Sequence, residues 1–135
     1  MIPTKPASAS NVVRVETSKL ICLLLETVFS WTKKFEKAKA EAWKIYRRRG
    51  EFLIKLLQDE LGLRGTSPEG AFYTMVDVRG ISDDLEIAER FLQNCVITVP
   101  GIAFGNKAKG FLHVSFCNNE GKIVKGVRRM KEVLI

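Results

Sequence analysis

The chain has 135 residues, a formal net charge of +7, and apolar residues at 46% of its positions. This length suits one domain, and the apolar and charged contents are those of an ordinary globular protein. The apolar run LICLLL (20–25) is flanked by charges and far too short to cross a bilayer, so we expect no membrane span. The first ten residues lack the apolar core of a secretory signal.

The cysteine pattern argues for a reducing compartment. Cys22, Cys95 and Cys117 are scattered singly, without a CxxC pair or a neighbouring histidine pair. An odd number of cysteines in apolar surroundings predicts reduced, buried thiols and a cytoplasmic protein, and it argues against a zinc site.

The N-terminal part of the sequence predicts helices. Residues 1–11 are rich in Pro, Ser and Ala and are expected to be extended or loose. A helix is predicted over about 14–29 and a second over about 31–61, ending where Gly62 follows the last turn. We therefore divide the chain into 1–30, an extended segment and helix, and 31–135, the main domain.

The net positive charge is densest in residues 33–52, where Trp43 and Tyr46 lie among lysines and arginines. Basic residues interleaved with aromatic ones can hold phosphates and stack on bases. We favour the alternative of an amphipathic helix with a solvated basic face, because acidic residues dilute the charge and apolar residues recur every three to four positions. That apolar stripe is predicted to comprise Phe35, Ala38, Ala42, Ile45, Phe52 and Leu56.

The C-terminal part predicts a mixed fold. Strands are expected at 71–78, 96–99 and 110–116. Ser82 is the predicted N-cap of a helix with Leu85, Ala88, Leu92 and Cys95 on its apolar face. Asn118 or Asn119 is predicted to cap a last helix, whose stripe is Ile123, Val127, Met130 and Leu134. The order predicts an α+β fold: a small, mostly antiparallel three-stranded sheet packed against helices, preceded by one or two long helices.

Several motifs from Arg47 onward occur in a familiar order. They are an arginine triplet at 47–49, PEGAFY (68–73), VITVPGIAFG (96–105), GFLHVSF (110–116), Asn119-Glu120 and GVRR (126–129). In this order and spacing, they resemble the C-terminal small domain of fold-type I, class I/II aminotransferases, the aspartate aminotransferase group. The resemblance covers about 90 residues and extends weakly upstream.

This resemblance implies an enzyme that uses pyridoxal 5'-phosphate. In the complete family enzyme a lysine holds the cofactor aldehyde and an aspartate pairs with its ring nitrogen, and both belong to a large domain that precedes the small one. Lys19 follows Thr17-Ser18, but LICLLLETVF follows it, without the glycine and arginine of the family motif. We interpret Lys19 as a surface lysine. We therefore expect no cofactor and no catalytic residue in this chain alone.

Two residues become candidates for substrate binding through the resemblance. His113, the only histidine, stands on the predicted strand 110–116 where the family has an arginine that clamps the substrate α-carboxylate. A guanidinium is a permanently charged, two-pronged donor, whereas an imidazole is mostly neutral at pH 7 and donates in one direction. The substitution weakens that contact. Phe72, in the PEGAFY motif, is the second candidate. A structural alternative for His113 is a polar residue on a partly exposed strand face.

The resulting prediction is an aminotransferase-like small domain, truncated relative to the family, that does not catalyse transamination alone. Its expected partners are a separately encoded large domain or a second copy through exposed apolar surface, and family members are homodimers. A non-catalytic interaction module is the first alternative. A basic nucleic-acid-binding domain is the less favoured one.

Overall fold

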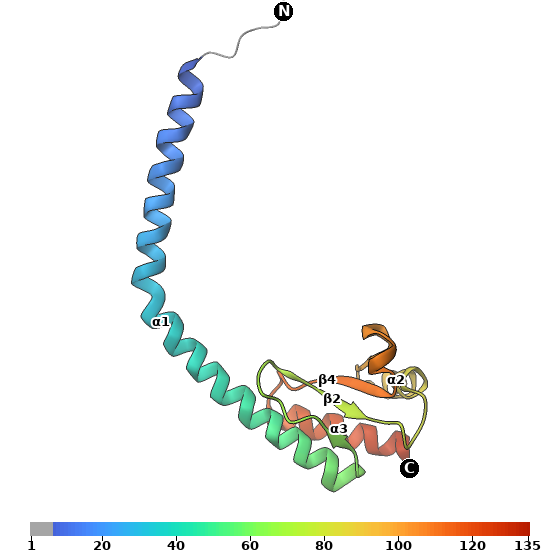
Figure 1. Ribbon diagram of the computed structural model, residues 1–135. Coiled ribbons are helices and arrows are strands. Elements are labelled where there is room, and N and C mark those ends of the chain that lie inside the picture. The colour runs from blue at the N-terminus through green and yellow to red at the C-terminus, as the bar shows by residue number, and fades with distance from the viewer. Residues whose placement is uncertain (1–6) are drawn as a thin grey trace, which may run out of the picture. The chain divides into compact units, whose positions relative to one another are not determined.

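The computed structural model describes the backbone of residues 7–135 and the side chains of residues 20–28 and 31–135. The chain divides into two compact units, residues 1–40 and 41–135. The first helix, α1 (Ala7–Leu61), contributes to both (Figure 1). The predicted loose segment 1–11 lies partly outside the described residues, and its residues 7–11 are helical.

One helix, α1, replaces the two that the sequence predicts. No proline occurs between Pro6 and Pro68, so every residue of α1 can donate its backbone N–H. Gly50 does not break the helix, because its bare Cα packs against Pro68 and Phe116, where a Cβ would lie 2.7 Å from Pro68 Cγ. The predicted end is confirmed: α1 stops at Leu61, and Gly62 takes a φ of +66°.

The sheet of the second unit has four antiparallel strands rather than the three predicted. Its order is β1-β2-β4-β3. The strands are β1 (Arg64–Gly65), β2 (Tyr73–Asp77), β3 (Val99–Pro100) and β4 (Phe111–Ser115). The strand missed by the sequence prediction is β1, two residues that pair with the end of β2 inside a segment expected to be a loop. A two-residue strand is too short to show alternation in sequence.

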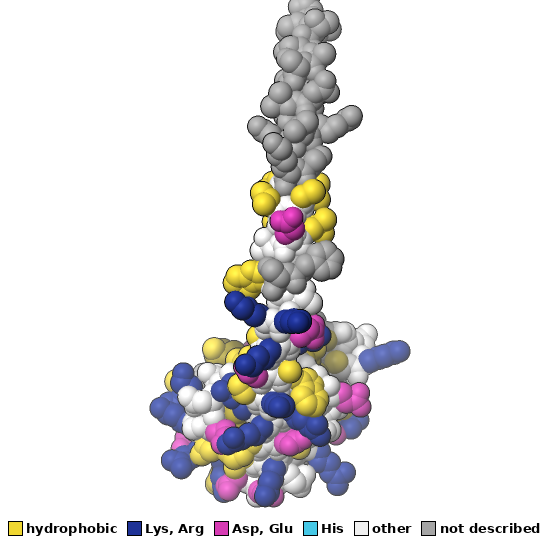
Figure 2. Space-filling view, turned by 90° about the vertical axis from the view of Figure 1, so that its left-hand side faces the viewer, with side chains coloured by type: hydrophobic (Ala, Val, Ile, Leu, Met, Phe, Trp, Pro, Cys, Tyr) yellow, Lys and Arg dark blue, Asp and Glu magenta, His cyan; other side chains and the backbone are white. Residues whose placement is uncertain are grey.

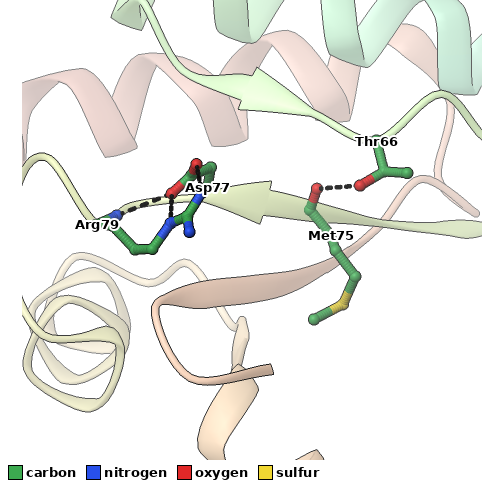
Figure 3. A network of polar contacts seen from close by, with 4 residues as sticks. All are labelled: Thr66, Met75, Asp77 and Arg79. Atoms are coloured by element: carbon green, nitrogen blue, oxygen red, sulfur yellow. Dashed lines mark hydrogen bonds and ion pairs between the residues drawn. The ribbon is translucent and has the colours of Figure 1, made fainter. Parts of the chain in front are cut away.

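Three side-chain contacts hold the β1 edge and the end of β2. Thr66 donates its hydroxyl to the Met75 carbonyl at 3.2 Å, and the Asp77 carboxylate pairs with Arg79 (Figure 3). The Thr74 hydroxyl donates a hydrogen bond to the Thr66 carbonyl at 2.5 Å. These contacts fix a segment that the sequence predicts to be a loop.

One face of the sheet is covered and forms the core. Val76, Leu112 and Val114 point to this face, where the last turns of α1 and the closing helix α3 (Glu120–Leu134) lie beside one another (Figure 1). The core also takes residues from all three α-helices and four connections, namely Leu53, Leu57, Leu63, Val78, Ile87, Ala88, Phe91, Val96, Phe116, Ile123, Val127 and Met130. Lys131 of α3 bridges to Glu60 of α1 at 2.8 Å on the rim.

The apolar stripe of α3 is confirmed, with Ile123, Val127 and Met130 buried. Asn119 is its N-cap and accepts a hydrogen bond from the Lys122 backbone N–H. The predicted stripe of residues 33–52 is wrong in part, because Phe35 and Ile45 are exposed and Leu53 and Leu57 are buried instead. The buried face of α1 is therefore the one that carries Leu53 and Leu57, because only this part of the helix packs against the sheet.

The helix α2 (Asp84–Gln93) differs from its prediction in cap and face. Asp83, not Ser82, is the N-cap and accepts from the Leu85 N–H. Ile87, Ala88 and Phe91 are buried, whereas Leu85 and Leu92 are exposed. Two overlapping apolar stripes exist in this short helix, and Phe91 buries more area than a leucine does.

The three cysteines are free, as predicted, but exposed rather than buried. Cys95 adopts a positive φ of 60° just past α2, a position at which the backbone turns and the side chain leaves the core. None of the helices within the described residues is long and apolar enough to cross a membrane.

Candidate functional site

The second face of the sheet carries the candidate site. Strand side chains alternate between faces, so Tyr73 and Met75 on β2 share this face with Phe111, His113 and Ser115 on β4. The antiparallel register pairs His113 with Met75 and with Val99 of β3. His113 therefore lies on an inner strand of the sheet, half-buried, on the face opposite the core.

The His113 imidazole lies between two aromatic rings. The Tyr73 ring centroid is 4.3 Å away at an interplanar angle of 28°, and the Phe104 centroid is 5.2 Å away at 27°. Both neighbours are stacked nearly parallel to the imidazole. Among the described residues, neither side-chain nitrogen of His113 has a hydrogen-bond partner. The flat stack holds the ring plane in place and leaves its nitrogen edges available.

Phe72, the second candidate, reaches His113 only through Tyr73. Its ring is 6.1 Å from Tyr73 in an edge-on arrangement and 6.1 Å from Tyr46 of α1. The backbone of Phe72 is anchored to β4, because its carbonyl accepts from the Phe116 N–H at 2.8 Å and from the Ser115 hydroxyl at 3.3 Å. The two predicted residues thus belong to one continuous row of rings: Tyr46, Phe72, Tyr73, His113 and Phe104, which we call the aromatic row.

The position of Phe104 depends on a buried carboxylate. Phe104 ends a 3₁₀ turn, η1 (Gly101–Phe104), that follows β3. Asp84, 1% exposed at the start of α2, accepts from the Ile102 backbone N–H at 2.7 Å. The turn also needs Gly101, since a Cβ there would overlap the Ala108 carbonyl oxygen. These two contacts hold η1 against α2 and set Phe104 beside His113.

The arginine on this face is already engaged. Arg79 donates to both oxygens of Asp77, at 2.9 and 2.6 Å, and its guanidinium lies 4.8 Å from the Phe111 ring (Figure 3). The hydrogen bonds from Arg79 lower the pKa of Asp77 from 3.8 to about 2, and the same pairing raises the pKa of Arg79. Gly110 leaves the space that Arg79 occupies, since a Cβ there would overlap the arginine side chain. Arg79 therefore cannot bind another carboxylate with the same nitrogens without losing Asp77.

The basic segment is also largely engaged within the fold. Arg47 pairs with Glu51 at 3.0 Å and covers Trp43, Arg48 pairs with Glu120 at 2.8 Å, and Arg49 donates to the Cys117 carbonyl. Arg48 and Arg49 thereby join α1 to the start of α3, whereas both contacts of Arg47 lie within α1.

The sequence analysis found His113 and Phe72 but not their neighbours. Tyr73 could be found from strand alternation, because it lies diagonal to His113 across the β2–β4 pair. Phe104 gave no such signal, since it belongs to a 3₁₀ turn whose direction depends on Asp84 and Gly101.

The described residues do not fit pyridoxal 5'-phosphate. The cofactor needs a lysine within reach of its aldehyde and a carboxylate at its ring nitrogen. Among the described residues, Lys55 and Asp59 line one cavity together, but both side chains are exposed on the same face of α1, and no aromatic ring lines that cavity. Among the described residues, no lysine makes a cation–π contact with a ring of the aromatic row. The side chain of Lys19 lies outside the described side chains.

Comparisons with known proteins show what this domain is similar to. The aspartate/prephenate aminotransferase of Thermus thermophilus is 38% identical over 90 residues, which are 66% of this chain and 23% of that protein. The aspartate aminotransferase of Thermotoga maritima is 28% identical over 127 residues, 93% of this chain and 32% of the relative. The aromatic aminotransferase structure from Pyrococcus horikoshii superposes with a TM-score of 0.68 at 33% identity, covering 73% of this chain and 26% of that one. No family model matches the chain.

The fold and these similarities together define a partial aminotransferase-like domain. It is related to the aspartate and aromatic aminotransferases, which are fold-type I enzymes of the pyridoxal phosphate class. The matches span about a quarter of the length of the first curated relatives (26%, 23% and 23%).

Proposed function

We propose that residues 31–135 act as the small domain of an aminotransferase, and that this chain alone neither holds the cofactor nor transaminates. The Schiff-base lysine and the phosphate cradle would then come from a large domain outside these 135 residues. In the complete assembly, the open face of the sheet covers the substrate cleft. The relatives' names suggest an amino acid of the aspartate or aromatic class as substrate.

His113 is the single observation that carries this proposal. By the resemblance of the GFLHVSF motif, it stands at the strand position expected for the family's carboxylate-binding arginine. The aromatic row holds it on the open face of the sheet. The position is retained while the permanent charge is lost. A neutral imidazole gives one hydrogen bond to a carboxylate where a guanidinium gives two charge-assisted ones, so binding of a substrate carboxylate is weaker here.

The residues around His113 have separate structural roles. Tyr73 and Phe104 fix the plane of the imidazole, and Asp84 positions the turn that carries Phe104. Phe72 and Tyr46 continue this wall of rings from Tyr73 toward α1, where Tyr46 packs against the core. Such a wall can exclude water from a cleft that another domain closes. Its own polar groups, the His113 imidazole and the Tyr46 and Tyr73 hydroxyls, include no amine that could form a Schiff base with the cofactor.

The test of the proposal uses the 135-residue chain and the cofactor. The protein is incubated with pyridoxal 5'-phosphate, reduced with borohydride and weighed by mass spectrometry, and turnover of aspartate with 2-oxoglutarate is measured in parallel. We expect substoichiometric labelling spread over several lysines and no turnover above the cofactor alone. One stoichiometric adduct on a single lysine, or turnover abolished by replacing that lysine, would contradict the proposal.

A further inference from the structure

His113 has a property that the arginine expected at its position lacks. A guanidinium stays charged throughout the ordinary range of pH, whereas an imidazole gains or loses its charge between about pH 5 and 8. His113 is also the only histidine of the chain, so no second imidazole shares this behaviour. A ligand site built on His113 can therefore change its charge near neutral pH.

The charged form of His113 has no counter-ion in the part of the chain that the structure describes. No carboxylate there lies within ion-pair distance of the ring. Asp77 projects from β2 on the same face of the sheet, but both of its oxygens accept hydrogen bonds from Arg79 (Figure 3). Lys107 and Lys109, which follow η1 in sequence, are exposed and carry the same sign of charge as an imidazolium. An imidazolium at this position therefore needs an anion from outside these residues.

The other groups packed around the imidazole are uncharged. Tyr73 of β2 and Phe104 of η1 stack on it, with 4.3 and 5.2 Å between ring centroids. Val99 of β3 is its register partner, and Ser115 is the next residue of β4 on the same face. The Tyr73 hydroxyl is the only titratable group among these four side chains, and a phenol does not change its charge between about pH 5 and 8. Between these limits, the local change of charge is therefore that of His113.

The ring stack suits a positive charge and limits how a ligand approaches it. The face of an aromatic ring is the negative part of its quadrupole and attracts a cation within about 6 Å. The Tyr73 and Phe104 centroids both lie inside this distance of the imidazole. Because these rings cover the imidazole faces, a ligand reaches His113 at the edge, where the N–H groups of an imidazolium point. A carboxylate, which only accepts hydrogen bonds, is the complement of that edge.

We propose that His113 is a pH-gated carboxylate clamp: the imidazolium binds a carboxylate of the substrate, and the neutral imidazole releases it. The proposal rests on the proposed function, from which it takes the carboxylate as ligand, and it adds the condition under which that carboxylate binds. A hydrogen bond from a charged donor is roughly twice as strong as one from a neutral donor. The complete assembly is therefore expected to bind its carboxylate substrate more tightly at about pH 6 than at about pH 8.

The test uses the full 135-residue chain and the NMR signals of its one histidine. Phenylacetate is the carboxylate probe, and phenylacetamide is the uncharged probe of the same shape. Each is titrated at constant ionic strength at several values between about pH 5 and 8.5. We expect the dissociation constant of phenylacetate to rise about tenfold per pH unit above the measured titration midpoint of His113, and that of phenylacetamide to change less than about twofold. Lysine and arginine side chains are spread over the face shown in Figure 2, but these side-chain types keep their charge in this range, so binding to them does not follow the titration.

Two variants separate the pH gate from the carboxylate site, and their binding is followed by the amide signals of residues 111–115. His113→Arg is permanently charged, and its affinity for phenylacetate is expected to vary less than about twofold over the same range of pH. His113→Gln is neutral at every pH and is expected to bind phenylacetate no more tightly than phenylacetamide. The remaining amide signals check that residues 41–135 stay folded.

The outcomes distinguish this proposal from the proposed function. If phenylacetate perturbs His113 but its dissociation constant does not change with pH, the gate is overturned and the carboxylate site is not. If phenylacetate at about 200 mM perturbs His113 at no pH, both the gate and the proposed carboxylate site are overturned.

Discussion

The two parts of the chain use the same kinds of residue in opposite ways. In residues 41–135, Phe91 and Phe116 are 1% and 0% exposed and pack among helices and strands of their own chain. In residues 20–38, Phe35 and Trp31 are 64% and 60% exposed. Apolar periodicity is therefore equally regular in a segment that builds a core and in a segment that has none. Periodicity tells which face of a helix is apolar, and only the fold tells what covers it.

The largest predicted difference in stability is between two phenylalanine-to-alanine variants, one in residues 41–135 and one in residues 20–38. Phe91→Ala leaves a cavity in the core and is expected to lower the free energy of unfolding by about 3 to 5 kcal/mol. Phe35→Ala is expected to change it by no more than about 0.5 kcal/mol, because the ring is exposed. Urea denaturation at low protein concentration measures both. Equal losses for the two variants would mean that residues 20–38 pack within the folded unit.

Two glycines sharpen the comparison within residues 41–135. Gly101→Ala brings a Cβ onto the Ala108 carbonyl and within 2.7 Å of the Phe111 carbonyl, so we expect a loss of about 2 to 3 kcal/mol and a disturbed η1 turn. Gly126 on α3 has open space around it, and Gly126→Ala is expected to stabilise by about 0.5 to 1 kcal/mol. Thermal unfolding of both variants checks the signs. A neutral Gly101→Ala would contradict the tight approach that places Phe104 beside His113.

The smallest predicted effect is the pH dependence of the Asp77–Arg79 pair. The pKa of Asp77 is about 2 in the folded chain, below its ordinary 3.8, so the pair stabilises the fold above about pH 4. That stabilisation is lost as the pH falls from about 4 through 2, because protonation removes the charge that Arg79 binds. The urea midpoint of the wild type is expected to fall more steeply over this range than that of Asp77→Asn. Parallel curves would show that the pair contributes nothing measurable.

The sequence predicts those features of the fold that depend on neighbouring residues, and it misses those that depend on contacts between distant residues. The α+β class, the stripe of α3 and the end of α1 at Gly62 follow from local patterns, and the structure confirms them. The β1 strand and the buried face of α2 were missed, because each depends on long-range packing that a single sequence does not show.

The candidate site follows the same rule. His113 became a candidate because the resemblance predicts an arginine at its position, and the alternation of β4 then places it on one face of the sheet. Its stacking between Tyr73 and Phe104 could not be found, because residues 40 and 9 positions away in sequence are brought together by the β2–β4 pairing and by the hydrogen bond from Ile102 to Asp84.

The most direct measurement uses a chimera of the Thermus thermophilus aspartate/prephenate aminotransferase, in which the matching quarter is replaced by the corresponding residues of this chain. The account predicts a chimera that binds pyridoxal phosphate but has a high KM for aspartate. His113→Arg in the chimera is expected to lower the KM for aspartate at least about tenfold, because it restores two charge-assisted hydrogen bonds. The control variant Ser115→Arg, on the same strand, is not expected to lower this KM. A chimera that fails to bind the cofactor, or a KM that His113→Arg leaves unchanged, would contradict the account.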